Sequence, residues 1–449
     1  MLKTQRIKVG IIGAGISGLI CACELEHLRP RSVILEKERE VGGHVRSFIE
    51  EGYTYDVGLH LFLGGYSYIL PFLKKAAVRL RYIGEGAVFY HNARFYRLER
   101  KISSILKFGL LDFSDRLKVL TNSNKILKSD LDYFMQYDEE NFAEWCEKNI
   151  SKKALELFYE PLIKSLTFLP PEEVSSGLWL HAEKLRIKER ESLAVYYPEK
   201  DVATAGLSVI SKALRWYCER MGSEVWTNTT VKQIVIEDER VKGIEYIHEG
   251  VDKFLEIPFV VFTGPISNLF NLISEKHFPG DFRERIKKFK YSSVLAIQIG
   301  LDKSLTDHRV VILTPNKLVN AVAQILPPYG IIAPPGKSLL AGTCIEPSFL
   351  NKTDDEIMEI IIEELKNPFP EIEKHLLWTK VLRIKNAIEA QSPGIMSLKL
   401  DTNRSPIEGL YFAGNYANND NWHSSIEGAA RSGHNCAKLI EKDAKVLLN

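Results

Sequence analysis

A glycine motif near the start of the sequence has the residue types and the spacing of a phosphate-binding turn. The apolar run Val9 to Ile12 is followed by Gly13, Gly15 and Gly18 in the pattern G-x-G-x-x-G. The pattern predicts a buried strand that turns sharply into a helix. Gly13 permits the bend, Gly15 lets a pyrophosphate approach the backbone, and Gly18 lets the helix pack on the strand. The residues that we expect at the phosphates are Gly13, Ala14, Gly15, Ser17 and Gly18.

An acidic residue follows this motif. A second apolar run ends in Glu36, at about the 20-residue spacing from Gly18 at which a carboxylate at a strand end accepts both ribose hydroxyls of a dinucleotide. We expect Glu36, with Lys37 beside it, to hold the ribose. A secretory signal or a membrane-spanning segment is the alternative, because basic residues precede the apolar stretch Val9 to Cys23. The glycines within that stretch and Glu24 after it argue against both.

A pair of glycines after Glu36 narrows the choice of dinucleotide. Gly42 and Gly43 can bring a second backbone turn against the same pyrophosphate, and Arg46 can add positive charge. This stretch, with residues 52–66, resembles the flavin amine oxidase superfamily, and within it the plant-type phytoene and zeta-carotene desaturases and the hydroxysqualene dehydroxylases. Nicotinamide enzymes lack the second glycine pair, so the resemblance implies FAD. The implied contacts are Gly42, Gly43, His44, Arg46, Gly58 and Leu59.

A second motif lies near the end of the sequence. Residues 405–415 predict a strand that ends in a glycine turn, and residues 424–433 predict a helix that begins with the capping box Ser424-x-x-Glu427. Small residues at 428, 429, 430 and 433 would let this helix approach a flat ligand, and its positive end would stabilise negative charge on a reduced flavin. The order resembles the closing motif of the desaturases, but Asn415 stands where Asp is usual and His44 where Lys or Arg is usual. The implied cofactor contacts are Gly414, Asn415, Ser425, Ile426, Glu427 and Ala429, with Val231 near the adenine, and Gly264.

Composition limits the class of partner. The chain has 449 residues, 45% of them hydrophobic, which is enough for two domains. Lys and Arg total 59 against 58 Asp and Glu, so the net charge of +1 gives no field that would attract nucleic acid. The six cysteines have no metal-ligand spacing, and no metal site is expected. We therefore expect a reduced, cytoplasmic location.

The order of predicted elements indicates an α/β fold. A doubly wound, Rossmann-like FAD-binding domain is expected from residues 1–65, 200–265 and 397–449, because strands and helices alternate there around an inserted β-meander. It would be interleaved with a mixed α+β substrate domain from residues 66–199 and 266–396. Within that domain, Val88 to Tyr90 and Arg94 to Leu98 predict a hairpin, and Asp354 to Leu365 predicts a helix.

Residues 102–120 form an amphipathic pattern with two interpretations. Apolar residues such as Leu110, Leu111 and Phe113 alternate with lysines and acids. A helix pair that faces the core is the simpler interpretation. The alternative is a helix that docks on a membrane surface and lets a lipid substrate enter from the bilayer. In that case the protein would be peripheral, on the inner face of the membrane.

The resemblance implies an FAD-dependent oxidoreductase that dehydrogenates a lipophilic, carotenoid-like isoprenoid by hydride transfer to flavin N5, with a quinone or oxygen as acceptor. Alternatives are a hydroxysqualene dehydroxylase-like enzyme, an amine or protoporphyrinogen oxidase, and a flavin-binding protein without activity. An amine oxidase would hold an aromatic pair over the flavin, for which Tyr416 and Trp422 are candidates. The sequence has no catalytic triad, paired carboxylate or metal cluster. The catalytic residue stays unknown, and His60 is the one candidate for contact with flavin or substrate.

Overall fold

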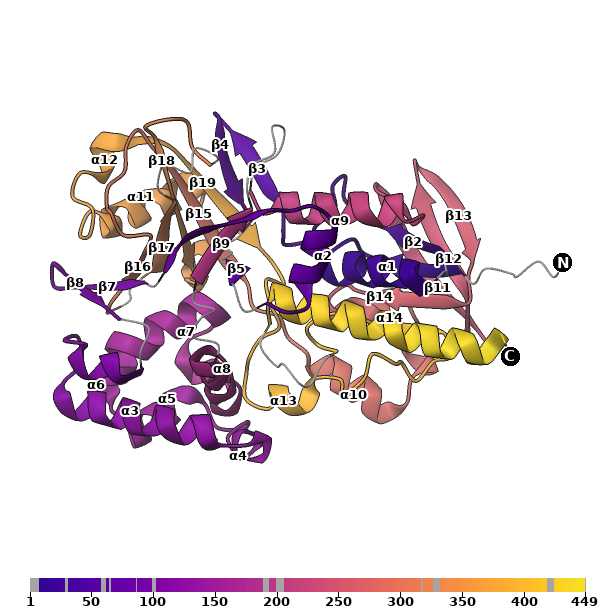
Figure 1. Ribbon diagram of the computed structural model, residues 1–449, viewed down its shortest axis with the longest axis horizontal. Helices are drawn as coiled ribbons and strands as arrows, with labels where there is room; N and C mark the ends of the chain where they lie inside the picture. Colours follow the sequence, from indigo (N-terminus) through magenta and orange to yellow (C-terminus); the bar gives the residue numbers. More distant parts are fainter. Residues whose placement is uncertain are drawn as a thin grey trace.

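The computed structural model describes residues 8–28, 31–57, 62–63, 66–85, 87–98, 102–188, 194–198, 206–315, 318–325, 332–417 and 424–448. Gly58, Leu59, His60 and Trp422 lie outside these ranges. Figure 1 shows two bodies side by side. One holds α1, α14 and a parallel sheet, and the other holds a second sheet with a group of helices below it.

A five-stranded parallel sheet forms the first body, in the order β10-β2-β1-β14-β20. Its strands come from distant parts of the chain: β1 (Lys8–Ile12), β2 (Arg31–Leu35), β10 (Glu224–Trp226), β14 (Phe259–Phe262) and β20 (Leu410–Phe412). β14 and β20 are fully buried, as strands of a parallel sheet covered on both faces should be. This sheet confirms the expected doubly wound α/β class.

Helices and a small sheet cover the two faces. The helices α1 (Ile16–Leu28), α9 (Ser208–Arg220) and α14 (Ile426–Leu448) pack together, with α1 in contact with both others. The expected β-meander is β11 (Thr229–Glu237), β12 (Arg240–His248) and β13 (Val251–Glu256). It covers β1, because a side chain at Gly10 would touch Ile244 and Ile257.

A seven-stranded mixed sheet forms the second body, in the order β19-β15-β18-β17-β16-β7-β8. Only the β16–β7 pair is parallel among its described pairings. The expected hairpin is β7 (Val88–His91) with β8 (Arg94–Arg97), and the expected helix is α11 (Asp354–Leu365). The other strands are β15 (Val294–Leu301), β16 (Val310–Leu313), β17 (Val319–Ile325), β18 (Ser338–Cys344) and β19 (Leu376–Ile384).

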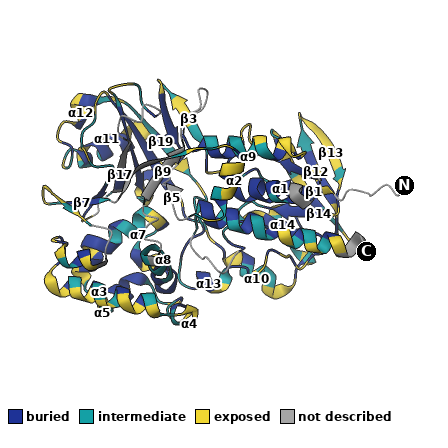
Figure 2. Ribbon diagram, viewed as in Figure 1, coloured by how far each residue is buried: buried dark blue, intermediate teal, exposed yellow. Residues whose placement is uncertain are grey.

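Below this sheet lies a helical region formed by residues 102–188 (Figure 1). It contains a 3₁₀ helix (Ile102–Lys107), α3 (Phe113–Lys128), α4 (Leu131–Met135), α5 (Phe142–Asn149), α6 (Lys152–Ala154), a π-helical turn (Leu155–Tyr159), α7 (Glu160–Thr167), a 3₁₀ turn (Pro171–Glu173) and α8 (Ser176–Lys188). Its interior is aromatic: Phe89 of β7 stacks on Phe158, with ring centroids 5.4 Å apart. The exposed residues of these helices lie on the outer side of the molecule (Figure 2).

The amphipathic stretch 102–120 is not one helix. A 3₁₀ helix and α3 are separated by a break, and Phe108, Leu110 and Leu111 in that break are 2–6% exposed and belong to the core. Phe113 and Leu117 of α3 are the exposed apolar residues, at 61% and 42%. The core interpretation therefore holds for most of the stretch. Among its large apolar side chains whose burial is described, only Phe113 and Leu117 are exposed.

The remaining described elements are short. They are β3 (Ser47–Glu50), β4 (Tyr53–Asp56), β5 (Phe62–Leu63), α2 (Ile69–Lys75), β6 (Leu80–Glu85), β9 (Ala194–Pro198), α10 (Gly280–Lys288), α12 (Ile372–His375) and α13 (Ile395–Leu398), with 3₁₀ helices Ile266–Asn271, Glu275–His277 and Pro347–Asn351. None of the helices in the described ranges combines the length and the apolar character needed to cross a bilayer.

Candidate functional site

The turn between β1 and α1 has an open approach at one of its glycines. Gly13 has φ +106°, and a Cβ there would come within 2.6 Å of Thr263 Oγ1. A Cβ at Gly18 would collide with the carbonyl oxygen of Gly13. A Cβ at Gly15 would meet no described atom within 4 Å beyond its chain neighbours. Gly13 and Gly18 are therefore required by the turn itself, and Gly15 is where a phosphate can reach the backbone.

The second glycine pair lies directly against this turn. Gly42 donates a 2.8 Å hydrogen bond from its N–H to the carbonyl oxygen of Ala14, and a Cβ on Gly43 would lie 3.4 Å from Gly15 Cα. Both have positive φ, +122° and +59°. Arg46 Nε donates to Gly43 O at 2.7 Å, which holds the guanidinium near the turn. His44 is exposed. The structure thus places the turn at Gly42 and Gly43 against the turn between β1 and α1, although the two turns are separated in the sequence.

Glu36 is anchored on the phosphate turn. Its Oε2 accepts a 2.7 Å hydrogen bond from Ala14 N–H, and its Oε1 accepts one of 2.9 Å from Glu38 N–H. The side chain is 7% exposed, and each oxygen keeps a second lone pair for a ribose hydroxyl. Lys37 instead points outward, where its Nζ lies 3.9 Å from Glu38. Val231 is half-buried in β11, a strand that begins beside Glu36, because Thr229 N–H donates to Glu36 O at 2.8 Å.

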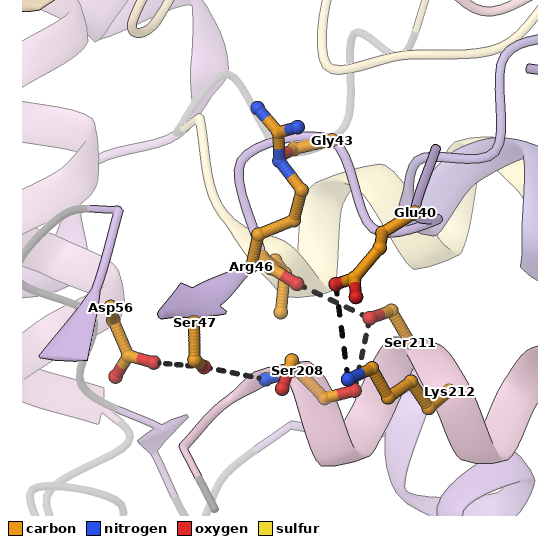
Figure 3. Close-up of polar contacts among 9 residues, drawn as sticks. Glu40, Gly43, Arg46, Ser47, Asp56, Ser208, Ser211 and Lys212 are labelled. Atoms are coloured by element: carbon orange, nitrogen blue, oxygen red, sulfur yellow. Dashed lines mark hydrogen bonds and ion pairs between the residues drawn. The ribbon is translucent and has the colours of Figure 1, made fainter. Parts of the chain in front are cut away.

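The N-terminus of α9, near the second glycine turn, is already capped. Asp56 Oδ1 accepts from Ser47 Oγ at 2.5 Å and from Leu207 N–H at 2.9 Å. Ser208 N–H donates to Ser47 Oγ at 3.0 Å, and Figure 3 shows Asp56, Ser47 and Ser208 in one line. This helix end therefore has protein partners for its N–H groups.

The turn after β20 holds the first residues of α14. Gly414 N–H donates to Ser432 Oγ at 3.0 Å, and Asn415 Oδ1 accepts from Ser425 N–H at 3.2 Å. Ser425 Oγ in turn accepts from Gly428 N–H at 3.0 Å. The N-cap of α14 is therefore Ser425 and not Ser424.

Similarity to known proteins identifies the cofactor of this site. A family model described as flavin containing amine oxidoreductase matches residues 16–440. The chain belongs to this family. It is 22% identical over 468 residues to a 15-cis-phytoene desaturase of Synechococcus elongatus, covering 97% of this chain and 96% of the relative. It is 23% identical to a zeta-carotene desaturase of Synechocystis, covering 97% of both chains.

Solved structures share the fold. A cyclohexylamine oxidase from Brevibacterium oxydans aligns with a TM-score of 0.73 at 16% identity, covering 98% of this chain and 100% of that one. An oxidoreductase from Methanosarcina mazei gives 0.76 at 19%, covering 97% and 100%. The protein is an FAD-dependent oxidoreductase of the flavin amine oxidoreductase family, and FAD fits the open Gly15 approach and the strand-end Glu36 described above. The expected family, enzyme class and cofactor are confirmed.

In this flavoenzyme the expected capping box does not form. Ser424 Oγ donates instead to Glu389 Oε2 at 2.5 Å. The Glu427 carboxylate accepts from the backbone N–H groups of Ser67, Tyr68 and Ile69, at 2.5, 2.7 and 3.1 Å. Glu427 therefore caps α2. The N-terminus of α2 lies opposite α14, and the N-cap side chain of α2 makes no capping hydrogen bond of its own.

The small residues of α14 also differ from expectation. A Cβ at Gly433 would collide with the carbonyl oxygen of Ser17, so this glycine lets α14 approach α1. Ala430 is fully buried, whereas Ala429 is partly exposed. The stripe thus serves mainly the helix–helix contact. Ser17 is 7% exposed in the same contact, and Ile426 is 9% exposed.

Several polar residues near the start of α14 belong to no recognisable sequence motif. Asn403 donates from Nδ2 to Phe412 O at 2.8 Å and to Ser432 Oγ at 3.1 Å, which fixes the turn after β20. Glu389 and Lys399 are buried, at 6% and 1% exposed. Charged residues in a segment without regular periodicity are ordinarily exposed, so nothing in the sequence distinguished these two. No group of three metal-ligating side chains occurs within the described ranges.

Proposed function

We propose that this flavoenzyme dehydrogenates a lipophilic isoprenoid of the carotenoid type. The observation that carries the proposal is the similarity to phytoene and zeta-carotene desaturases along nearly the whole of both chains. The match includes the helical region 102–188, which is the part of the chain that would distinguish substrates. Bound FAD would supply the hydride acceptor at N5, with a quinone or oxygen as the final electron acceptor.

The FAD contacts that we propose follow the carboxyl edge of the parallel sheet. The adenine end is assigned to Glu36 and Val231, and the pyrophosphate to the turns at Gly13, Ala14, Gly15 and Gly42, Gly43. The flavin end is assigned to Gly264, Gly414, Asn415 and the start of α14. Accordingly, residues 1–65, 200–265 and 397–449 are assigned to FAD binding, and residues 66–199 and 266–396 to the substrate.

The chain's role in such a reaction is to orient the substrate and exclude water. The packed aromatic core of the helical region gives such a site a rigid support. The ring centroids of Phe142 and Tyr159 lie 5.2 Å apart, and those of Phe89 and Phe108 lie 5.3 Å apart. The π-helical turn Leu155–Tyr159 supports a site here, since such turns occur frequently at functional sites. It is fixed to the neighbouring sheet, because Thr314 Oγ1 donates to Leu157 O at 2.8 Å.

Oxidation of an amine is the main alternative, and one residue speaks against it. An aromatic pair over the flavin would need exposed rings. Tyr416 is 2% exposed, and its hydroxyl donates to Phe262 O at 3.1 Å, inside the sheet. It is therefore not available to line a pocket. The proposal favours an isoprenoid over an amine on this ground.

We also propose that the protein associates with a membrane surface through α3. Phe113 and Leu117 are exposed, and the Arg116 guanidinium lies 5.7 Å from the Phe113 ring centroid. Apolar side chains beside basic residues suit the interface of a bilayer with anionic lipids. Such a location, on the inner face of the membrane, would give access to a lipid-dissolved substrate.

The proposal is tested by anaerobic mixing of the FAD-loaded protein with phytoene, a squalene derivative, protoporphyrinogen and a primary amine. Loss of oxidised-flavin absorbance with phytoene is the expected result. Squalane, which has no allylic C–H bond, is the matched control and should leave the flavin oxidised. Bleaching by the amine or by protoporphyrinogen, with none by the polyenes, would overturn the proposal.

A further inference from the structure

Two opposite charges are buried together near the start of α14. Glu389 Oε2 accepts a 2.5 Å hydrogen bond from Ser424 Oγ, one residue before the N-cap Ser425. Lys399, at the end of α13, is 1% exposed and interacts electrostatically with Glu389. A carboxylate and an ammonium group are costly to bury, and each is tolerated only with a partner.

Backbone and hydroxyl contacts place this pair behind the ends of β14 and β20. Leu400 N–H, next to Lys399, donates to Tyr416 O at 2.8 Å, and the Tyr416 hydroxyl donates to Phe262 O in β14. Tyr291 forms a β-bridge with Glu389 and accepts from Ile266 N–H at 2.8 Å through its hydroxyl. The pair therefore lies at the carboxyl edge of the sheet, beyond Phe262 and Phe412.

The strand order says which half of FAD reaches this edge. Glu36 follows β2, the phosphate turn follows β1, and the sheet continues through β14 to β20. With the ribose at β2 and the pyrophosphate at β1, the remaining half of the dinucleotide extends over the ends of β14 and β20. This half carries the flavin ring, so the buried charges lie on the flavin side of the site.

The cluster also contains two tyrosine hydroxyls and the Arg285 guanidinium, which donates to the backbone oxygen of Lys399. Burial, and the charge of Glu389, raise the pKa of the Tyr291 and Tyr416 hydroxyls well above their usual value. Burial lowers the pKa of Lys399 to about 8, and Glu389 opposes this shift. Both tyrosines are thus neutral and Lys399 is mostly protonated at pH 7. The field at the flavin end then depends on Glu389, Lys399, the Arg285 guanidinium and the positive end of the α14 dipole.

We propose that Glu389 and Lys399 form a charge pair that sets the reduction potential of the bound FAD. Reduction adds negative charge to the flavin. The negative charge of Glu389 disfavours reduction, whereas the positive charge of Lys399 favours it. Both residues act on the flavin through their electric field and not by direct contact. This inference rests on the proposed function and on the position that it gives the flavin.

The test is equilibrium reduction of the FAD-loaded protein against a reference dye at pH 7, without substrate. Glu389→Gln should raise the equilibrium constant for flavin reduction about tenfold, and Lys399→Gln should lower it by a similar factor. The double variant should return close to the parent, because both charges are gone. Lys399→Arg, which keeps the charge, should stay near the parent. Arg404→Gln, which removes an exposed cation paired with Asp443 at 2.7 Å, is the control and should change nothing.

A structural role alone would give a different pattern. Both single substitutions would then lower FAD affinity, and the double variant would be worse than either. Equal shifts in the same direction, or no shift beyond twofold, would overturn the inference. If Glu389→Gln does not fold, the comparison of Lys399→Gln with Lys399→Arg decides alone. Because no substrate is present, an unexpected substrate would overturn the proposed function and leave this result standing.

Discussion

The Glu427 carboxylate accepts a 2.7 Å hydrogen bond from the backbone N–H of Tyr68. It thereby ties the start of α14 to the start of α2, two helices at opposite ends of the chain. The carboxylate lies at the positive ends of both helices, which favour its negative charge although it is only 7% exposed.

Glu427→Ala should therefore destabilise the protein. The N–H groups of Ser67, Tyr68 and Ile69 would lose a charged acceptor, which costs about 2 to 4 kcal/mol of unfolding free energy. Urea denaturation of the FAD-free protein measures this. Glu441→Ala on the same helix, which breaks only a surface pair with Lys445, is the control. A loss below about 1 kcal/mol would show that α2 does not depend on this cap.

Glu36→Ala should weaken FAD binding about thirty-fold, which corresponds to about 2 kcal/mol for the lost bonds to a charged acceptor. Quenching of flavin fluorescence on titration gives the affinity. Glu40→Ala removes an exposed carboxylate that pairs with Lys212 at 3.8 Å, as Figure 3 shows, and should bind normally. Unchanged affinity in Glu36→Ala would contradict the ribose assignment.

Asn415→Asp should stabilise the FAD-free protein by about 0.5 to 1 kcal/mol. A carboxylate at this position still accepts from Ser425 N–H, and its charge interacts favourably with the α14 dipole. Thermal unfolding checks the direction. Asn415→Leu keeps the size but removes the acceptor, and should be less stable than the parent. A less stable Asp variant would mean that the asparagine side-chain amide has a second partner worth more than the dipole term.

Phe113→Ser combined with Leu117→Ser should release the protein from anionic liposomes without unfolding it, because both side chains are exposed. Co-sedimentation measures the release. Leu110→Ser is the contrasting variant: Leu110 is 6% exposed, so this change should cost about 2 to 4 kcal/mol of stability. If the parent protein does not sediment with liposomes, the membrane proposal is wrong.

The charge effect of Lys399 should disappear at high pH. Burial lowers its pKa to about 8, so the side chain is charged below that pH and neutral above it. The groups around it are the Glu389 carboxylate, the neutral Tyr291 and Tyr416 hydroxyls, and the Arg285 guanidinium, which bonds to the backbone oxygen of Lys399. The parent and Lys399→Gln should differ most near pH 7 in dye-coupled reduction and converge by about pH 9.5. A constant difference across this range would contradict the assignment of this pKa.

Local patterns predicted the elements whose signals are contained in a few neighbouring residues. The helix Asp354–Leu365 has its own capping box, in which Thr353 and Glu356 satisfy each other, and its bounds are as expected. The strand–turn–helix at Gly13 likewise needs only residues within one unit. Ser424 and Glu427 have the same spacing as a capping box, but each side chain finds a stronger partner elsewhere: Glu389 for Ser424, and the end of α2 for Glu427.

Other features depend on tertiary packing and could not be predicted from the sequence. Leu110 and Leu111 belong to a core that also includes Phe134 and Phe158, so their burial depends on helices that follow them in the chain. The role of Gly433 depends on Ser17, nearly the whole chain away. The Glu389–Lys399 pair depends on how residues 289–292 and 398–400 are brought to the end of β20. Such contacts have no periodic signal, because the tertiary fold and not the spacing of the two partners in the sequence brings them together.

The close contact between Gly433 and Ser17 has a consequence for how the protein is made. The first helix emerges from the ribosome early, with Leu19, Ile20 and Cys23 on apolar surface that α9 and α14 cover in the finished protein. α14 is synthesised much later than α1, and β20 joins the sheet only shortly before α14. The nascent chain therefore carries an incomplete nucleotide-binding half until β20 and α14 have been synthesised. A product truncated before residue 426 would expose the α1 surface, and chaperones and proteases recognise exposed apolar surface of this kind.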